Sequence, residues 1–387
     1  MAVFGTRPET IKLAPVLGAI RKREPRLHSV AVLSGQHNEL LYPFVRFFGI
    51  PVKYDLAVMV PQQTLTQVCA RVIEHLEVVL TQEKPDLLLV QGDTATALAA
   101  ALAAFYHKVP VGHVEAGLRT DDRHNPFPEE MNRRLITQLA TYHFAATEFN
   151  RSTLRGEGVP GENIFVTGNP VVDAVLQIQR GKKCSPATEE VIAATRGMKR
   201  VVLTTHRRES FGETMSGHLQ ALRRFVEGDE NTCLLFPVHP NPNVVRVAQE
   251  ILAGHPRVHL LAPLDYPDFI RLLSESWLIV SDSGGVQEEA PTLGRPVLVI
   301  RETTERPEAV AAGVARLIHG GPEHLAAALA DLRRDDSWIQ RVKEVENPFG
   351  RGNSGELIAA AIEKVLLKGS EDDEHLPAGR SHQAAIH

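Results

Sequence analysis

The chain contains little cysteine and no long hydrophobic run. Its 387 residues include 3 cysteines, Cys69, Cys184 and Cys233, which are scattered without the spacing of metal ligands. So few thiols argue against a disulfide scaffold and are typical of a reducing compartment. No apolar run reaches the roughly 20 residues that span a bilayer. The N-terminus lacks the basic segment and apolar core of a signal peptide. We therefore expect a soluble, cytoplasmic protein.

Several familiar motifs are also missing. There is no G-x-S-x-G elbow, which argues against that type of serine hydrolase. There is no G-x-x-x-x-G-K-[ST] loop, which argues against nucleotide hydrolysis by a P-loop mechanism. No histidine, cysteine or acidic cluster has the spacing of a metal site. The net charge of −5 does not support a general attraction to nucleic acid or to an anionic membrane.

A repeated order of strand, loop and helix runs through the chain. Its length is enough for two domains of ordinary size. Apolar runs predict strands at residues 30–34, 86–91, 109–114, 142–146, 164–167, 200–204, 233–238, 258–261, 277–281 and 297–301. Helical patterns fall at 94–106, 217–227, 267–274 and 357–367, and residues 368–387 are predicted to be a disordered tail. The pattern predicts an α/β protein with two doubly wound parallel sheets, joined near residues 168–186.

The run at residues 113–134 is the richest in chemistry. It holds Glu115, Glu129 and four arginines, and a predicted strand leads directly into it. Open α/β sheets place ligands at the carboxyl ends of their strands, so the run indicates acid–base chemistry on an anionic substrate. Asp93 ends another strand, where capping of the next helix is as plausible as catalysis for Asp93 alone. His113, Glu115 and Glu129 favour catalysis because all three can reach the same edge.

Three other strand ends carry phosphate-binding features. At residues 281–289 (SDSGGVQEE), a helix cap explains the glutamates but not the glycine pair, so we favour a diphosphate held by backbone N–H groups. The run THRRE at 205–209 offers guanidinium groups that match phosphate oxygens, although a solvated charge run is the alternative. The run GTRPE at 5–9 is equally consistent with a phosphate loop and with a simple turn.

Taken in order, these runs resemble the non-hydrolysing UDP-N-acetylglucosamine 2-epimerases of bacteria. The resemblance covers residues 3–367 and rests on eleven runs: GTRPE (5–9), SGQH (34–37), QGDT (91–94), HVEAGLR (113–119), PEEMNRR (128–134), GNPVVD (168–173), THRRE (205–209), HPNP (239–242), SDSGGVQEE (281–289), TTERPE (303–308) and NPFG (347–350). It implies a GT-B fold, in which two Rossmann-like domains face each other across a cleft. The first domain would comprise residues 1–168 plus 353–367, with the C-terminal helix crossing back to it, and the second residues 169–352.

The family interconverts UDP-GlcNAc and UDP-ManNAc by eliminating UDP to 2-acetamidoglucal and adding it back. By motif match, the resemblance implies catalytic roles for Asp93, Glu115, Glu129 and His206. It implies UDP or substrate contacts for Arg7, Arg207, Arg208, His239, Phe269, Ser283, Gly284, Gly285, Glu289 and Arg306. An activating second UDP-GlcNAc would lie near Gln36, His37 and Gln63. It implies no metal and no NAD, and a homodimer is usual in the family.

Two assignments and three alternatives stay open at this point. Arg133 and Arg134 are predicted to begin a helix with a structural role, and His239 could equally be a ligand contact or a buried, hydrogen-bonded histidine. A hydrolysing relative would release UDP and free ManNAc. A GT-B glycosyltransferase would need an acceptor, and a non-catalytic sugar-nucleotide sensor would bind without turnover.

Overall fold

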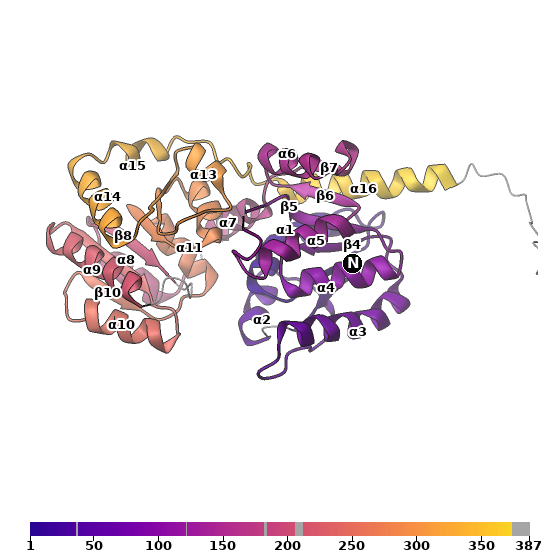
Figure 1. The fold of residues 1–387 in the computed structure, drawn as a ribbon, viewed down its shortest axis with the longest axis horizontal. Helices are drawn as coiled ribbons and strands as arrows, with labels where there is room; N and C mark the ends of the chain where they lie inside the picture. Colours follow the sequence, from indigo (N-terminus) through magenta and orange to yellow (C-terminus); the bar gives the residue numbers. More distant parts are fainter. Residues whose placement is uncertain (36–37, 121, 182–183, 206–211, 374–387) are drawn as a thin grey trace, which may run out of the picture.

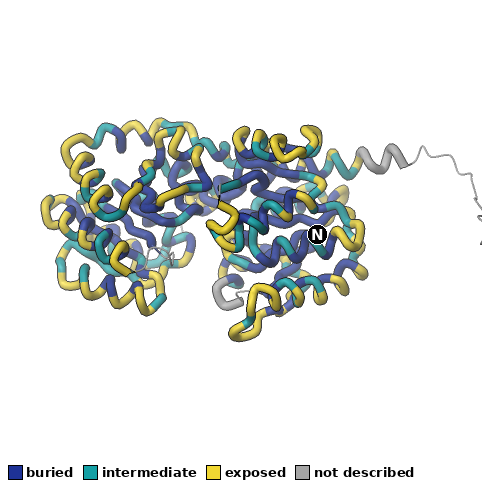
Figure 2. Tube along the Cα trace, in the orientation of Figure 1, coloured by how far each residue is buried: buried dark blue, intermediate teal, exposed yellow. Residues whose placement is uncertain are grey.

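The computed structural model describes residues 1–35, 38–120, 122–181, 184–205 and 212–373, and it contains two parallel β-sheets flanked by helices (Figure 1). The half that contains the N-terminal sheet and the half that contains the second sheet lie side by side along the long axis of the molecule (Figure 1). The strands of both sheets are largely buried, as their continuous apolar runs require in a parallel sheet covered on both faces (Figure 2).

The first sheet has the strand order β3-β2-β1-β4-β5-β6-β7, and its neighbouring strands are parallel. Its strands are β1 (Ala2–Phe4), β2 (Ala31–Leu33), β3 (Val52–Asp55), β4 (Leu88–Gln91), β5 (Val111–Ala116), β6 (Tyr142–Ala145) and β7 (Ile164–Val166). The order reverses between β1 and β4, so the loops that follow these two strands diverge to opposite faces and leave room for a ligand.

The helices of this half begin with clear capping signals. Thr64 caps α3: its hydroxyl accepts from the Gln67 N–H at 3.3 Å, and Gln67 Oε1 accepts from the Thr64 N–H at 2.8 Å. The helices are α1 (Arg7–Arg21), α2 (Asn38–Phe47), α3 (Leu65–Glu83), α4 (Ala95–Tyr106), α5 (Glu129–Leu139), α6 (Glu148–Gly156) and α7 (Pro170–Gly181), with a 3₁₀ turn, η1 (Gly161–Asn163).

The second sheet repeats the scheme with the order β10-β9-β8-β11-β12-β13, reversing between β8 and β11. Its strands are β8 (Lys199–Thr204), β9 (Thr232–Pro237), β10 (Val258–Leu261), β11 (Leu278–Ser281), β12 (Val297–Val299) and β13 (Ala315–Leu317). Its helices are α8 (Pro186–Ala194), α9 (Glu213–Glu227), α10 (Pro242–Leu252), α11 (Tyr266–Ser274), α12 (Gly284–Glu289), η3 (Ala290–Leu293), α13 (Pro307–Ala311), α14 (Pro322–Arg334) and α15 (Ser337–Val342). The last helix of the described chain is α16 (Ser354–Asp373). None of the helices in the described part of the chain is long and apolar enough to cross a membrane.

One buried apolar cluster joins the two halves. It contains Phe4 and Phe144 from the first sheet, Leu235 and Ile279 from the second, and Val175 of α7. Helix α7 lies in the region where the sequence predicts the junction, and it packs against α1, α11, α12 and α16. The junction therefore contains a packed helix, and the predicted domain boundary between residues 168 and 169 stays a prediction.

Helix α16 returns to the first half, as the resemblance implies (Figure 1). Its Glu356 forms ion pairs with Lys22 at 3.0 Å and with Arg23 at 2.8 Å, and both partners directly follow the end of α1. A Cβ on Gly355 would lie 2.7 Å from the carbonyl oxygen of Pro15, so glycine is needed for this close approach to α1. Helix α16 runs through residues 368–373, which the sequence analysis places in the tail, and the disorder of the tail stays a prediction.

The predicted set lacks the short central strand β1 and two edge strands, β3 and β13. The side chains of β3 and β13 are partly exposed, so neither has the continuous apolar run used to find the other strands. β3 instead alternates between half-buried and exposed positions, the pattern of a strand with one covered face. The predicted fold class, with two doubly wound sheets, is confirmed.

Candidate active site

The predicted site residues follow strands at the two points where strand order reverses. Asp93 lies just after β4, and Ser283 lies just after β11. The two edges face each other, because the ammonium of Lys12 on α1 lies 2.9 Å from the carboxylate of Glu288 on α12. Polar groups from both halves therefore meet at the carboxyl ends of the central strands, where a ligand of a doubly wound sheet is expected.

Glu115 has an unusual backbone conformation within β5. Its φ is +65°, in the left-handed region that non-glycine residues rarely adopt. The β5–β6 register also shifts here, since Val114 pairs with Phe144 and Ala116 pairs with Ala145, which leaves Glu115 as an extra residue. A bulge of this kind redirects a side chain, and strained backbone of this kind concentrates at functional sites.

Three side chains hold the carboxylate of Glu115, which is only 5% exposed. Asn169 Nδ2 donates to Oε1 at 2.9 Å, and the ammonium of Lys12 donates to the same oxygen. Gln91, at the end of β4, donates through its side-chain amide to Oε2. Both carboxylate oxygens are therefore fixed by donors from β4, α1 and the segment before α7.

Glu115 belongs to a buried charged cluster that we define as Lys12, Glu115, Glu288 and Arg306. Arg306 Nε donates to Glu288 Oε1 at 2.7 Å, and its Nη2 lies 4.0 Å from Glu115 Oε1. The cluster holds two positive and two negative charges, and it crosses from the first half to the second. Charges buried this deeply are tolerated because they are paired.

The cluster sets the charge state of its members. Burial works against ionisation of Glu115, but the nearby Lys12 and Arg306 hold its pKa below the usual value. Burial likewise opposes the charge on Lys12, yet Glu115 and Glu288 raise its pKa. Burial raises the pKa of Glu288 despite the same two cations. Glu115 is thus an ionised carboxylate while Lys12 and Arg306 are in place.

Asp93 is held by an arginine and does not cap the helix that follows it. Thr94 is the N-cap of α4, and its hydroxyl accepts from the Ala97 N–H at 3.0 Å. Arg133 donates to Asp93 Oδ2 through Nε at 3.1 Å and Nη2 at 2.5 Å. The capping interpretation of Asp93 is therefore wrong, and Arg133, predicted to be structural, contacts a catalytic candidate directly.

Helix α5 also brings Glu129 to this region. Glu129 is the first residue of α5 and is half-buried. Asn132 and Arg133, three and four residues later, contact Asp93, so Glu129 shares the helical face that meets it. Glu130 is fully buried and accepts from Arg134 Nε at 2.7 Å, which gives it a structural position.

The run at residues 5–9 forms a tightly held turn. Glu9 is 1% exposed, and its carboxylate accepts from the N–H groups of Gly5 at 2.9 Å and Thr6 at 2.7 Å and from the Thr94 hydroxyl at 2.6 Å. Glu9 therefore ties the loop after β1 to the loop after β4. Arg7 is exposed in this turn, with its guanidinium 5.8 Å from the centre of the Phe44 ring.

The glycine-rich run begins α12, as predicted. The Ser283 N–H already donates to the Ser281 hydroxyl at 3.0 Å. A Cβ on Gly284 would lie 2.8 Å from Arg306 Nη1, so glycine lets the guanidinium approach the start of the helix. Glu289 accepts from the Tyr266 hydroxyl at 2.8 Å, and burial, with the nearby Glu288, raises the pKa of Glu289 to about 6.

The remaining predicted residues are dispersed or lie outside the described residues. His239 is exposed, and its Nδ1 accepts from the Asn241 N–H at 3.2 Å, so it is not a buried histidine. Phe269 on α11 packs against the core cluster. Gln63 accepts from the Val60 N–H at 3.1 Å within an outer loop. Five predicted residues lie outside the described part of the chain: Gln36, His37, His206, Arg207 and Arg208.

His113 faces the protein interior and does not line the site. Its ring is fully buried, and Nε2 lies 2.7 Å from the Gly92 carbonyl oxygen. Burial, together with the nearby His143, lowers the pKa of His113 to about 3. His113 is therefore neutral, and it positions the loop that carries Asp93.

We expect buried histidines to reduce stability at mildly acid pH. Burial lowers the pKa of His143 from 6.5 to about 4 in the folded chain. Below pH 6.5 the unfolded chain binds a proton that the folded chain does not, so stability falls as pH drops from about 6.5 towards 4. The loss for one such histidine is roughly 2 kcal/mol at pH 5. His143→Asn should therefore lose less stability than the wild type in urea unfolding between about pH 7.5 and pH 5.

The exposed His28 offers a matched control, since its side chain is 75% exposed. His28→Asn should retain the wild-type pH dependence. An equal pH dependence in His143→Asn and the wild type would show that His143 does not titrate differently in the folded state.

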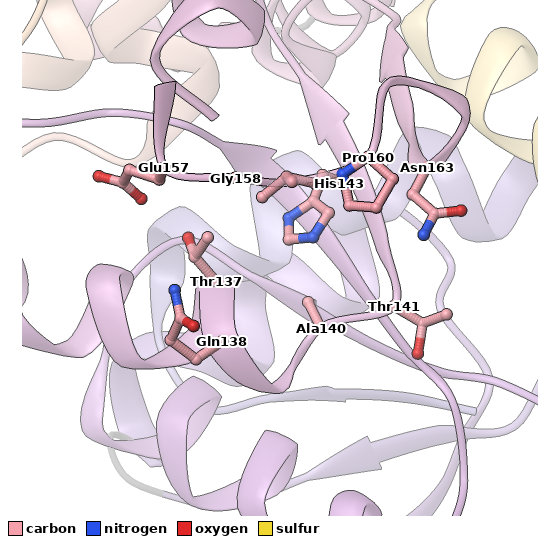
Figure 3. A pocket seen from close by; sticks show the side chains of 10 residues that line it. Thr137, Gln138, Ala140, Thr141, His143, Glu157, Gly158, Pro160 and Asn163 are labelled. Carbon is pink, nitrogen blue, oxygen red and sulfur yellow. The ribbon is translucent and has the colours of Figure 1, made fainter. Parts of the chain in front are cut away.

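A separate pocket of about 200 Å³ lies at the amino ends of β6 and β7 (Figure 3). Its lining includes Thr137, His143, Glu157 and Asn163, and Glu157 also forms an ion pair with Arg119. None of the predicted site residues within the described ranges lines this pocket. Within the described ranges, no group of three or more His, Cys, Asp or Glu side chains could hold a metal ion.

The sequence analysis missed three groups that contact Glu115: Lys12, Gln91 and Asn169. Gln91 lies two residues before Asp93 in the run QGDT, and Asn169 lies in the run GNPVVD, so membership of these two runs was the available signal. Lys12 had a weaker signal, a single lysine in a mostly apolar helix. Only the packing of α1 against the second half shows that this lysine is 6% exposed.

Comparisons with known proteins agree with the motifs. A family model described as UDP-N-acetylglucosamine 2-epimerase matches residues 19–363. The UDP-N-acetylglucosamine 2-epimerase of Salmonella typhimurium is 44% identical over 372 residues, which cover 95% of this chain and 99% of the relative.

Solved structures give the same result. The UDP-GlcNAc 2-epimerase of Neisseria meningitidis, solved bound to UDP-GlcNAc, is 40% identical with a TM-score of 0.87, over 95% of this chain and 99% of that one. The UDP-GlcNAc 2-epimerase of Methanocaldococcus jannaschii, solved with UDP-GlcNAc and UDP, is 33% identical with a TM-score of 0.80, again over 95% and 99%. The chain belongs to the UDP-N-acetylglucosamine 2-epimerase family.

Proposed function

We propose that this protein interconverts UDP-GlcNAc and UDP-ManNAc without hydrolysing either sugar nucleotide. The observation that carries the proposal is the redirected, fully hydrogen-bonded carboxylate of Glu115, which lies between the Asp93 loop and α12. Family membership narrows the substrate to a UDP-linked N-acetylhexosamine, because the related structures bind UDP-GlcNAc.

Inversion at C2 needs both acid–base groups and a stabilised leaving group. The carbon C2 is not adjacent to a carbonyl that could stabilise a carbanion, so simple deprotonation of C2 is very unfavourable. In an elimination, a base takes the C2 proton, the C1–O bond to UDP breaks and a C1=C2 double bond forms. Return of a proton to the other face of C2 and of UDP to C1 completes the inversion. We assign the proton transfers to Asp93, Glu115 and Glu129.

The departing diphosphate needs positive charge and N–H donors. Arg306 lies against the start of α12, and Arg7 is exposed beside the first loop, so both can approach phosphate oxygens. A helix N-terminus adds further donors for an anion. We therefore assign the diphosphate to Arg7, Arg306 and residues 283–285. His206, Arg207 and Arg208 are proposed for the same task on the motif match alone.

The nucleoside contacts rest on the resemblance. Phe269 is proposed to contact uracil and Glu289 the ribose, which requires Glu289 to exchange its contact with Tyr266. His239 is proposed as a further substrate contact, and Gln36, His37 and Gln63 as part of an activating site. The homodimer and the cytoplasmic location also stay proposals.

Proton NMR of the purified protein with UDP-GlcNAc alone tests the function. We expect UDP-ManNAc to accumulate to equilibrium, and in D₂O we expect deuterium at C2 of both sugars because the C2 proton is lost and returned. Free ManNAc with stoichiometric UDP would instead identify a hydrolysing enzyme. No reaction without an acceptor would favour a glycosyltransferase, and saturable binding without turnover under any condition would favour a sensor.

A further inference from the structure

Lys12 is a buried cation to which the mechanism above assigns no task. It lies in the second turn of α1, and its side chain is 7% exposed. Its ammonium hydrogen-bonds Glu115 on β5 and lies 2.9 Å from Glu288 Oε2 on α12. The contact with Glu288 is therefore a close ion pair between α1 and α12.

This position is costly unless both carboxylates are present. An ammonium loses several kcal/mol of hydration when buried, and attraction to close anions must offset that loss. Fold stability alone could be met by an apolar side chain at this place, since replacing a buried ion pair by apolar residues is often neutral or stabilising. The arrangement is easier to understand if the charge acts on a neighbour.

The neighbours connect two parts of the proposed reaction. Glu115 is a proposed acid–base residue, and Glu288 lies on the same short helix as Gly284 and Gly285, which are proposed to contact the diphosphate. Lys12 is thus a direct link between the carboxylate proposed to act on C2 and the helix proposed to hold the leaving group.

We infer that Lys12 is a positioning residue for the reaction, which holds Glu115 as an anion in the orientation set by the β5 bulge and ties it to α12. The inference rests on the proposed function. Lys12 contacts the proposed acid–base carboxylate directly, so it acts through Glu115.

The charges around Glu115 make the effect of Lys12 separable from packing. Glu115 faces Lys12 from α1, Arg306 from the segment before α13, Asp93 from the loop after β4 and Glu288 from α12. Removing the cation should make Glu115 harder to ionise, whereas removing the anion Glu288 should make it easier. A purely structural disturbance has no reason to act in opposite directions.

The test measures kcat and kcat/KM against pH for Lys12→Met, Glu288→Gln and the double variant. We expect Lys12→Met to shift the inflection of one limb of the pH profile to higher pH by about 1–3 units, which is the usual effect of losing an opposite charge within contact distance. We expect Glu288→Gln to shift the inflection of the same limb to lower pH. The result holds whether Glu115 acts as the acid or the base, because either limb follows its ionisation.

The double variant keeps the test decisive if Lys12→Met does not fold. It replaces a charged pair by a neutral pair, so the net charge of the cluster is unchanged. The inflection of this limb in the double variant should lie at higher pH than in Glu288→Gln alone. The same limb position in the double variant and in Glu288→Gln, or a uniform loss of kcat at every pH, would overturn the inference.

Glu115→Gln separates this outcome from failure of the proposed function. Full turnover in Glu115→Gln would remove Glu115 from the reaction and overturn the proposed function. If Glu115→Gln lost turnover but the Lys12 variants kept the pH profile of their parent proteins, only the role of Lys12 would be overturned.

Discussion

Replacing Glu115 by glutamine is expected to lower kcat for epimerisation by about 10²–10⁴-fold, the usual contribution of a positioned acid–base group. Glutamine keeps the shape of the side chain but can neither take nor return a proton at C2. Lys12 retains its ion pair with Glu288, so the variant should fold. Turnover of UDP-GlcNAc and exchange of the C2 hydrogen with D₂O measure the loss, and calorimetry with UDP should show retained binding.

Glu157→Gln provides the matched control for this experiment. Glu157 is also paired with an arginine, Arg119, at 2.6 Å, but it lines the separate pocket at the amino ends of β6 and β7 (Figure 3). Its kcat should stay close to that of the wild type. If Glu115→Gln kept kcat within tenfold of the wild type and still exchanged the C2 hydrogen, Glu115 would not be an acid–base residue.

Replacing Arg306 by methionine is expected to lower the free energy of unfolding by about 3–5 kcal/mol, the cost of leaving a buried partner charge unpaired. Arg306 contacts Glu288 at 2.7 Å and Glu305 at 3.3 Å, and its side chain is 10% exposed. Methionine fills part of the space but leaves these carboxylates short of one cation. A loss of this size is a large share of the 5–15 kcal/mol that stabilises a typical protein. Urea unfolding at neutral pH measures it.

Arg334→Met removes an arginine from an exposed pair with Asp331, in which the two side chains are 78% and 62% exposed. That change should cost no more than about 1 kcal/mol, because water already solvates both charges. Similar unfolding midpoints for Arg306→Met and Arg334→Met would contradict the view that the charged cluster is electrostatically buried.

The sequence predicted most of the central strands but only two of the four edge strands, β7 and β10. Strands such as β5 and β11 are covered on both faces, and their uninterrupted valine, leucine and isoleucine runs can be read without knowing their neighbours. The strands β3 and β13 lie at sheet edges and expose part of their surface. Their identity as strands depends on the neighbour that pairs with them, and a local pattern does not contain that information.

The same division applies to the site. Asp93 and Ser283 could be assigned to strand ends because glycine and polar residues follow apolar runs at those positions. The partner of Asp93 could not be assigned, since Arg133 lies 40 residues away along the chain. Its predicted place at the start of a helix suggested a structural role, and only the packing of α5 shows that it contacts Asp93.

The sequence by itself determined the α/β class, the two repeated halves, the family and the strand ends that carry Asp93, Glu115 and residues 283–285. Those features follow from local patterns and from motif order. Only the tertiary structure decided the left-handed backbone of Glu115 and the burial of Lys12 between Glu115 and Glu288. The charge state of a buried group depends on which charges lie within a few ångströms, and here those charges come from distant segments, such as Lys12 and Glu288, which lie 276 residues apart.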